Sequence, residues 1–122
     1  MPMFEINTNA KVANIPSNFV VDTSKTISEM IGKPVQQVAV RLNAGQLMAF
    51  GGSTDPCALV SMKSIGKISQ NENIKYAKVI TEVLGKLGVK PDRMYITFTN
   101  LAKDNVGFQG NTIFGLEKAA GK

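Results

Sequence analysis

Apolar and polar residues alternate in several short segments of the chain, and two longer segments carry apolar residues at helical spacing. The alternation predicts strands at 3–8, 38–42 and 94–98, a shorter strand at 46–50 and a longer one at 57–65. Apolar positions three and four residues apart predict helices over 19–31 and 71–87. Gly32 and Gly88 stand where these helices should end, and the Gly51-Gly52 pair predicts a turn.

The two halves of the chain correspond at a constant offset of 57 residues. This offset matches Phe19 with Tyr76, Lys33 with Lys90, and Pro34 with Pro91, although Gly32 has no partner. We therefore expect one domain over 1–122, with an internal repeat of two βαβ units at about 2–50 and 57–108. Right-handed crossovers would place both helices on one face of a four-stranded mixed sheet, in the α/β (α+β) class.

The other face of this sheet would then need cover. We expect several apolar residues to lie there, namely Phe4, Ile6, Val38, Val40, Leu59 and Ile96. The simplest cover is another copy of the chain. A homo-oligomer would also compensate for the limited core of a 122-residue chain.

Composition removes several classes of function. The sequence has no His and one cysteine, Cys57, so zinc sites and Ser-His or Cys-His catalysis are excluded within one subunit. The net charge of +5 suits anionic small molecules, but the Lys residues are scattered and form no nucleic-acid surface; a solvated surface is the simpler explanation. We expect no membrane insertion and no signal peptide, because neither pattern is present.

The first two residues, Met1 and Pro2, carry the main candidate chemistry. A small second residue permits removal of the initiator Met, which would leave Pro2 as a secondary amine at the head of a strand. An amine that titrates near neutral pH is a candidate general base. The alternative is that Met-Pro is simply a common start of a protein chain.

Ordered blocks from Pro2 to about Ile113 resemble the macrophage migration inhibitory factor family. The blocks are Asn7-Thr8-Asn9, Gly32-Lys33-Pro34, 46–53, 56–59, 64–68, 91–93 with Tyr95-Ile96, and Val106-Gly107-Phe108. The resemblance implies a homotrimer of tautomerase fold whose sheets wrap a solvent channel. It also implies a cofactor-independent phenylpyruvate or dopachrome keto–enol tautomerase. A cytokine-like role at a cell-surface receptor is implied as well, for a protein both cytoplasmic and secreted without a leader.

The resemblance assigns roles to individual residues. Pro2 would be the catalytic base, and Lys33 with the backbone N–H of Ile65 would hold the substrate's carboxylate or oxygen. Tyr95 would reach in from the adjacent subunit, beside Thr97. The aromatic pocket would be lined by Met3, Ser64, Val106 and Phe108. Without the resemblance, Lys33 would be taken to neutralise a helix C-terminus, and Tyr95, Ile65 and Phe108 to be core or interface residues.

The chain also departs from the family pattern. Cys57-Ala58-Leu59-Val60 replaces a Cys-x-x-Cys, so Cys57 is expected to be a buried small residue. Thr97 replaces an Asn, Gln37 replaces an aromatic at the pocket rim, and the tail 115–122 either adds a helical turn or remains mobile. The alternative function is a receptor-binding signalling protein with a vestigial pocket.

Overall fold

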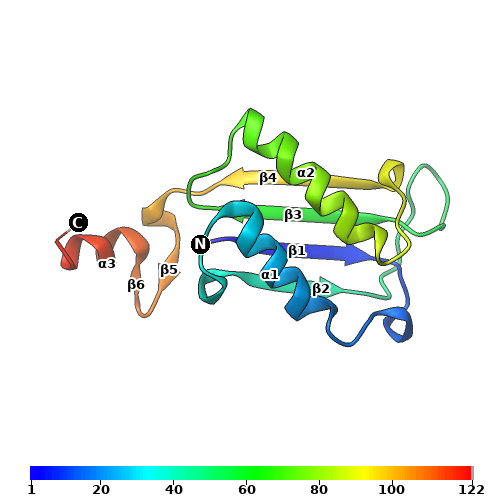
Figure 1. The fold of residues 1–122 in the computed structure, drawn as a ribbon, viewed down its shortest axis with the longest axis horizontal. Helices are drawn as coiled ribbons and strands as arrows, with labels where there is room; N and C mark the ends of the chain where they lie inside the picture. The colour runs from blue at the N-terminus through cyan, green and yellow to red at the C-terminus, as the bar shows by residue number, and fades with distance from the viewer. Residues whose placement is uncertain (122) are drawn as a thin grey trace.

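The computed structural model describes residues 1–121, and its centre is a four-stranded mixed sheet in the order β2-β1-β3-β4 (Figure 1). Strand β1 (Met3–Thr8) pairs in parallel with β2 (Ala39–Asn43) and antiparallel with β3 (Ala58–Ser64). Strand β3 in turn pairs in parallel with β4 (Met94–Asn100). The α+β class and the mixed sheet predicted from the sequence are therefore confirmed.

Helices α1 (Phe19–Ile31) and α2 (Gln70–Gly85) join the parallel strands and cover the same face of the sheet (Figure 1). Helix α1 ends at Gly32, whose φ of 72° is the left-handed conformation that glycine adopts without strain. Helix α2 starts after Ser69, whose hydroxyl accepts the N–H of Glu72. It ends at Gly85, earlier than predicted, because a tighter turn over Lys86 to Gly88 follows.

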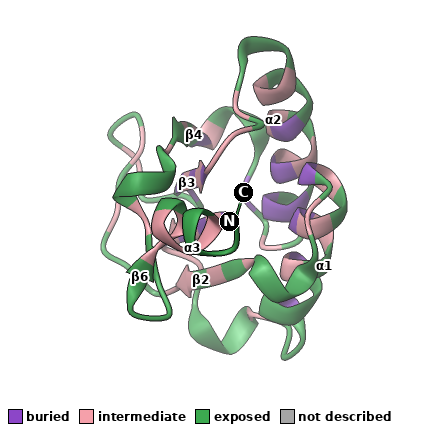
Figure 2. Ribbon diagram, turned by 90° about the vertical axis from the view of Figure 1, so that its left-hand side faces the viewer, coloured by how far each residue is buried: buried purple, intermediate pink, exposed green. Residues whose placement is uncertain are grey.

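The core lies between the two helices and the sheet. Alternate residues of β1 and β3 are buried, and the buried side of each helix in Figure 2 is turned toward these strands. The largest fully buried side chains include Phe4, Ile6, Ile27, Met62, Ile80 and Leu84. Burial of each such side chain contributes about 1.5–3 kcal/mol. Cys57 is buried and free, as predicted.

The prediction that six apolar residues lie on the uncovered face was wrong for five of them. Phe4 and Ile6 are fully buried, and Val38, Val40 and Ile96 pack against the same core. The strand register explains why these residues are in the core. Phe4 pairs with Val40, so both side chains point to the face that the helices cover. Only Leu59, which is 50% exposed, lies on the other face.

The uncovered face of the sheet is mainly polar. Its residues are the alternates of the buried ones, including Met3, Glu5, Asn7, Arg41, Ser61, Lys63, Tyr95 and Thr97. Arg41 and Glu5 form an ion pair of 3.9 Å across this face. A face of this composition tolerates water, so it creates no need for an apolar cover.

The predicted short strand at 46–50 was also wrong. Phe50 and Ser53 exchange backbone hydrogen bonds of 2.9 and 3.1 Å, which turn the chain back on itself. The two residues between them, Gly51 and Gly52, have φ of 59° and 78°, so the predicted turn is confirmed. The preceding residues run as a loop, in which Leu47 is fully exposed.

A small C-terminal unit lies beyond one end of the main sheet (Figure 1). It consists of a hairpin of β5 (Gly107–Phe108) and β6 (Asn111–Thr112), followed by helix α3 (Ile113–Ala119). Of the two states considered for the tail, the structure has the helical one over these residues.

Short 3-10 helices occur at η1 (Val12–Asn14), η2 (Val35–Gln37), η3 (Pro91–Arg93) and η4 (Lys103–Asn105). Within residues 1–121, no helix has the length and apolar character to span a bilayer.

Candidate functional site

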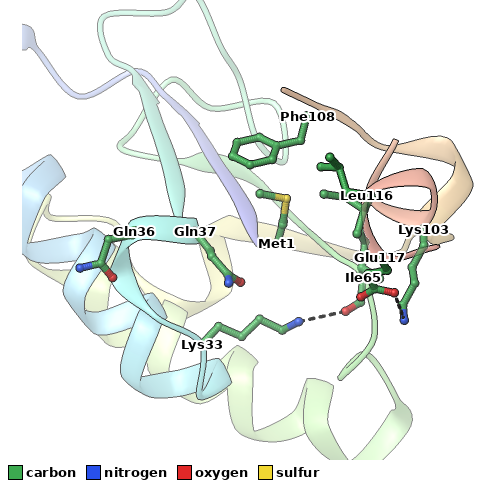
Figure 3. Close-up of a pocket in the computed structure, with 10 residues that line it drawn as sticks. Met1, Lys33, Gln36, Gln37, Ile65, Lys103, Phe108, Leu116 and Glu117 are labelled. Carbon is green, nitrogen blue, oxygen red and sulfur yellow. Dashed lines mark hydrogen bonds and ion pairs between the residues drawn. The ribbon is translucent and has the colours of Figure 1, made fainter. Parts of the chain in front are cut away.

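A cavity of about 550 Å³ lies at the start of β1, between the main sheet and the C-terminal unit (Figure 3). Its walls come from the chain start, the segment after α1, the loop after β3, η4, and the C-terminal unit. The lining residues are Met1, Lys33, Gln36, Gln37, Ile65, Lys103, Phe108, Ile113, Leu116 and Glu117. This volume suits a small ligand.

The amine of Met1 lies at this cavity and has an altered basicity. Burial, followed by the charge and hydrogen bonding of Lys33, lowers the pKa of this amine from 8.0 to about 6. Desolvation and a neighbouring cation both disfavour a protonated amine. The environment at the head of β1 therefore keeps an amine neutral and able to accept a proton.

Lys33 is half-buried and points its ammonium group into the cavity. Its Nζ donates a hydrogen bond of 3.2 Å to the carbonyl oxygen of Ile65 (Figure 3). At the end of α1, backbone groups supply the hydrogen bonds: the N–H groups of Gly32 and Lys33 both donate to the carbonyl of Ser28. The alternative role of Lys33 was to neutralise the end of α1, but its ammonium group is hydrogen-bonded to Ile65 and not to a carbonyl of that helix.

A second hollow of about 270 Å³ adjoins the cavity and shares Met1, Gln36, Gln37 and Phe108 with it. Met3 and Val106 line this hollow. The structure therefore brings six of the predicted site residues to one place, either as lining groups or directly behind them: Pro2, Met3, Lys33, Ile65, Val106 and Phe108. Pro2 itself is fully buried behind Met1.

Ser64 departs from its predicted role in the pocket. It belongs to the buried alternation of β3 and is 0% exposed. Its hydroxyl has no hydrogen-bond partner, and the residue lines neither the cavity nor the hollow. The neighbouring Ile65 does line the cavity, because it follows Ser64 just after the buried alternation of β3 ends.

Tyr95 and Thr97 lie away from the cavity of their own chain. Tyr95 pairs with Leu59, which pairs with Asn7, four residues along β1 from Met3. At about 3.3 Å per residue this is a separation of roughly 13 Å along the sheet. Tyr95 is 67% exposed on the uncovered face. Within one chain, neither residue reaches the cavity.

The surroundings of Tyr95 are nevertheless well defined. Its ring packs against Phe50 at 5.0 Å between centroids, and the Arg93 guanidinium lies 5.6 Å from the Phe50 centroid. Arg93 also donates hydrogen bonds to the carbonyls of Ser53, Asp55 and Pro56. The 50–56 loop is thereby held against the start of β4, and Tyr95 is presented outward from a rigid base.

Sequence reasoning missed the cavity wall formed by the C-terminal unit. The missed residues of this wall are Ile113, Leu116 and Glu117, and Gln36 and Lys103 were missed on the neighbouring walls. A signal for this wall was present, because Thr112 is a good helix cap and the apolar residues 113 and 116 are three apart. Their position against the cavity depends on the path of the hairpin, which the pattern does not contain.

The cavity combines a weakly basic amine, a lysine ammonium and an apolar wall of Phe108, Ile113 and Leu116. This combination suits a small carboxylate with an apolar body. Among residues 1–121, no three His, Cys, Asp or Glu side chains gather to hold a metal ion. The fold and cavity define a class of α+β proteins in which the head of the first strand forms part of a ligand-sized site.

Comparison with known proteins identifies the family within this class. The family model described as macrophage migration inhibitory factor (MIF) matches residues 1–114. Macrophage migration inhibitory factor of Rattus norvegicus is 42% identical over 113 residues, covering 92% of this chain and 98% of the relative. The homolog from Trichinella spiralis is also 42% identical over 113 residues, covering 92% of this chain and 99% of the relative.

Solved structures agree with the sequence comparison. The structure of the factor from Trichinella spiralis matches with a TM-score of 0.87 at 40% identity, covering 90% of this chain and 98% of that one. The Toxoplasma gondii protein matches with a TM-score of 0.80 at 31% identity, covering 90% and 98%. The chain belongs to the macrophage migration inhibitory factor family.

Proposed function

We propose that this protein is a cofactor-independent keto–enol tautomerase of aromatic 2-keto acids, such as phenylpyruvate or dopachrome-like compounds. Pro2 is its general base after removal of Met1. The observation that carries the proposal is the lowered pKa of the terminal amine beside Lys33. Removal of Met1 would place the Pro2 nitrogen at the same end of β1, where burial and Lys33 would favour its neutral form.

The proposed reaction needs only groups that the cavity supplies. The neutral Pro2 nitrogen takes a proton from the carbon next to the keto group. The electron pair of the broken C–H bond forms a C=C bond, and the carbonyl oxygen gains the negative charge. Lys33 and the Ile65 backbone stabilise the oxygen and the adjacent carboxylate, and the proton then passes to the enolate oxygen. No atom or electron is gained or lost overall.

We further propose that the site is completed in a homotrimer. Tyr95 and Thr97 lie on the uncovered face, away from the cavity of their own chain, so only another copy can supply them. Mixed subunits test this. Refolding Pro2→Gly together with Tyr95→Ala subunits should yield more activity than the average of the two variants, because some sites then combine an intact Pro2 with an intact Tyr95. Activity equal to that average, or a monomer by sedimentation, would contradict the assembly.

A cytokine-like role, with leaderless secretion and a cell-surface receptor, is the second proposal for this protein. Its support is the name of its curated relatives, which are macrophage migration inhibitory factors. The tautomerase and signalling roles are separable in principle, and a vestigial pocket would leave only the second. Binding of labelled protein to macrophages, with and without a Pro2 variant as competitor, tests the signalling role.

The tautomerase proposal is tested by mass and turnover on the same sample. Protein purified from its natural source should lack Met1 in an intact-mass spectrum and should ketonise phenylenolpyruvate. Active protein that retains Met1 would refute Pro2 as the base, because the nitrogen of Pro2 would then be an amide. A processed but inactive protein would favour the vestigial pocket.

A further inference from the structure

We infer that the C-terminal helix α3 is a selectivity wall of the cavity, on which Leu116 recognises the apolar end of the ligand. This inference rests on the proposed function for the kind of ligand, but it adds a residue beyond the segment that the family model covers. That model ends at residue 114, and α3 continues to Ala119. The part of the wall that carries Leu116 thus lies outside the segment that the family model matches.

The start of α3 is anchored by local hydrogen bonds. The hydroxyl of Thr112 accepts the N–H of Gly115 at 2.9 Å, and the N–H of Ile113 donates to the carbonyl of Val106 at 2.9 Å. Val106 lines the adjoining hollow. Gly115 lies so close to the Asn111 side chain that an added Cβ would overlap it. The hairpin therefore fixes where α3 begins relative to the cavity.

The far part of α3 is tied to η4 by an ion pair. Lys103 Nζ and Glu117 Oε2 are 2.8 Å apart, and both residues line the cavity (Figure 3). Both side chains are partly exposed, so this pair contributes little stability by itself. It joins the end of α3 to η4 at the cavity.

Leu116 lies between these two anchors and is half-buried. It lines the cavity together with Ile113 and Phe108, and Figure 3 draws the side chains of Leu116 and Phe108. Among the polar groups that line the cavity, the Met1 amine and Lys33 come from the head of β1 and the segment after α1, whereas Lys103 and Glu117 are paired with each other. A carboxylate held by Lys33 would therefore leave the rest of the molecule to contact the wall. Apolar contact of this kind favours an aromatic or branched body over a short one.

Binding of two unreactive acids tests the inference without relying on catalysis. The full chain is titrated calorimetrically with 3-phenylpropionate and with propionate, which share a carboxylate but differ in the phenyl group. Leu116→Ala should weaken 3-phenylpropionate binding about tenfold and leave propionate unchanged. Leu116→Met, which keeps the volume, should restore wild-type binding. Lys118→Ala is the matched control on the same helix, since Lys118 is exposed and lines no part of the cavity.

The outcomes separate this inference from the proposed function. Unchanged 3-phenylpropionate binding in Leu116→Ala, with the helix content intact by circular dichroism, would overturn the wall. Equal losses for both acids would also overturn it, because the effect would not depend on the apolar end. If Leu116→Ala weakens only the phenyl acid while wild-type protein fails to turn over phenylpyruvate, the wall stands and the tautomerase proposal fails.

Discussion

The two halves of the main sheet share an architecture but differ in chemistry. In each half a helix joins two parallel strands, α1 between β1 and β2 and α2 between β3 and β4. Lys33 and Lys90 are matched by the 57-residue offset, and each precedes a proline and a 3-10 helix. Only Lys33 enters a cavity; Lys90 is exposed and lines neither the cavity nor the hollow.

The difference follows from where each half begins. In the first half the Met1 amine lies at the cavity beside Lys33, whereas every nitrogen at the start of the second half belongs to a peptide bond. The C-terminal unit also lies beside the start of β1 and closes a cavity there. A repeated supersecondary unit therefore supplies the framework, and the segment before β1 together with the C-terminal unit forms a cavity in the first half.

Replacing the proposed base, which only the first half contains, should lower the catalytic activity the most. Pro2→Gly removes the secondary amine, and we expect kcat/KM for phenylpyruvate to fall by about 10²- to 10⁴-fold, the usual contribution of a positioned general base. Steady-state kinetics measure this, with the melting temperature as a check on folding. An undiminished rate in a folded variant would exclude Pro2 as the base.

The matched lysines provide the next test. Lys33→Ala should lower kcat/KM by about 10- to 100-fold, because a charge-assisted hydrogen bond to the substrate contributes about 1.5–3 kcal/mol. Lys90→Ala removes the same charge from the corresponding place in the second half and should leave the kinetics unchanged. Equal losses in both variants would show that net charge, and not the cavity, attracts the substrate.

The pH dependence of the rate sharpens the same comparison. A base must be neutral to accept a proton, so kcat/KM should rise with pH and level off above the pKa of the Pro2 amine. We expect that pKa below the ordinary value of an α-amine, as burial and Lys33 lower the pKa of the Met1 amine to about 6. Lys33→Ala should move the inflection upward but only part of the way, since burial is the larger cause. A pH profile that Lys33→Ala leaves in place would contradict this coupling.

The smallest effect is expected in the core, where the halves are most alike. Phe19 and Tyr76 are matched by the offset and are each 4% exposed. The Tyr76 hydroxyl also donates a 2.7 Å hydrogen bond to the carbonyl of Lys67. Tyr76→Phe should therefore lower the free energy of unfolding by about 1 kcal/mol, measured by urea denaturation at fixed protein concentration, with activity retained. A stability loss above about 3 kcal/mol would mean that the ring, and not the hydroxyl, is displaced.

Local pattern was sufficient for most of the fold. The strands at 3–8 and 94–98 and the first helix were placed within one or two residues because alternation, helical spacing and a left-handed glycine act over short distances. It was harder to predict which face of each strand is buried. Phe4 and Val40 alternate with polar residues whichever way the strand is turned, and only packing against α1 and α2 decides which set is inside.

The site was predictable in part. Residues tied to the chain start and to the end of α1, such as Met3 and Lys33, do line the cavity or its adjoining hollow. Ser64 was placed in the pocket, but the alternation of β3 turns it into the core. Leu116 and Glu117 were missed because their contribution depends on the hairpin that brings α3 to the cavity that Lys33 also lines.

The amino-acid sequence by itself determined which segments are strands and helices, because backbone conformation and apolar spacing are properties of neighbouring residues. It also determined that a proline nitrogen stands at the head of the first strand. Only the tertiary structure decided that Lys33, the chain start and α3 enclose one cavity while Tyr95 lies roughly 13 Å along the sheet. Those relations join residues distant in the chain, and their free energy comes from packing and desolvation that no local pattern specifies.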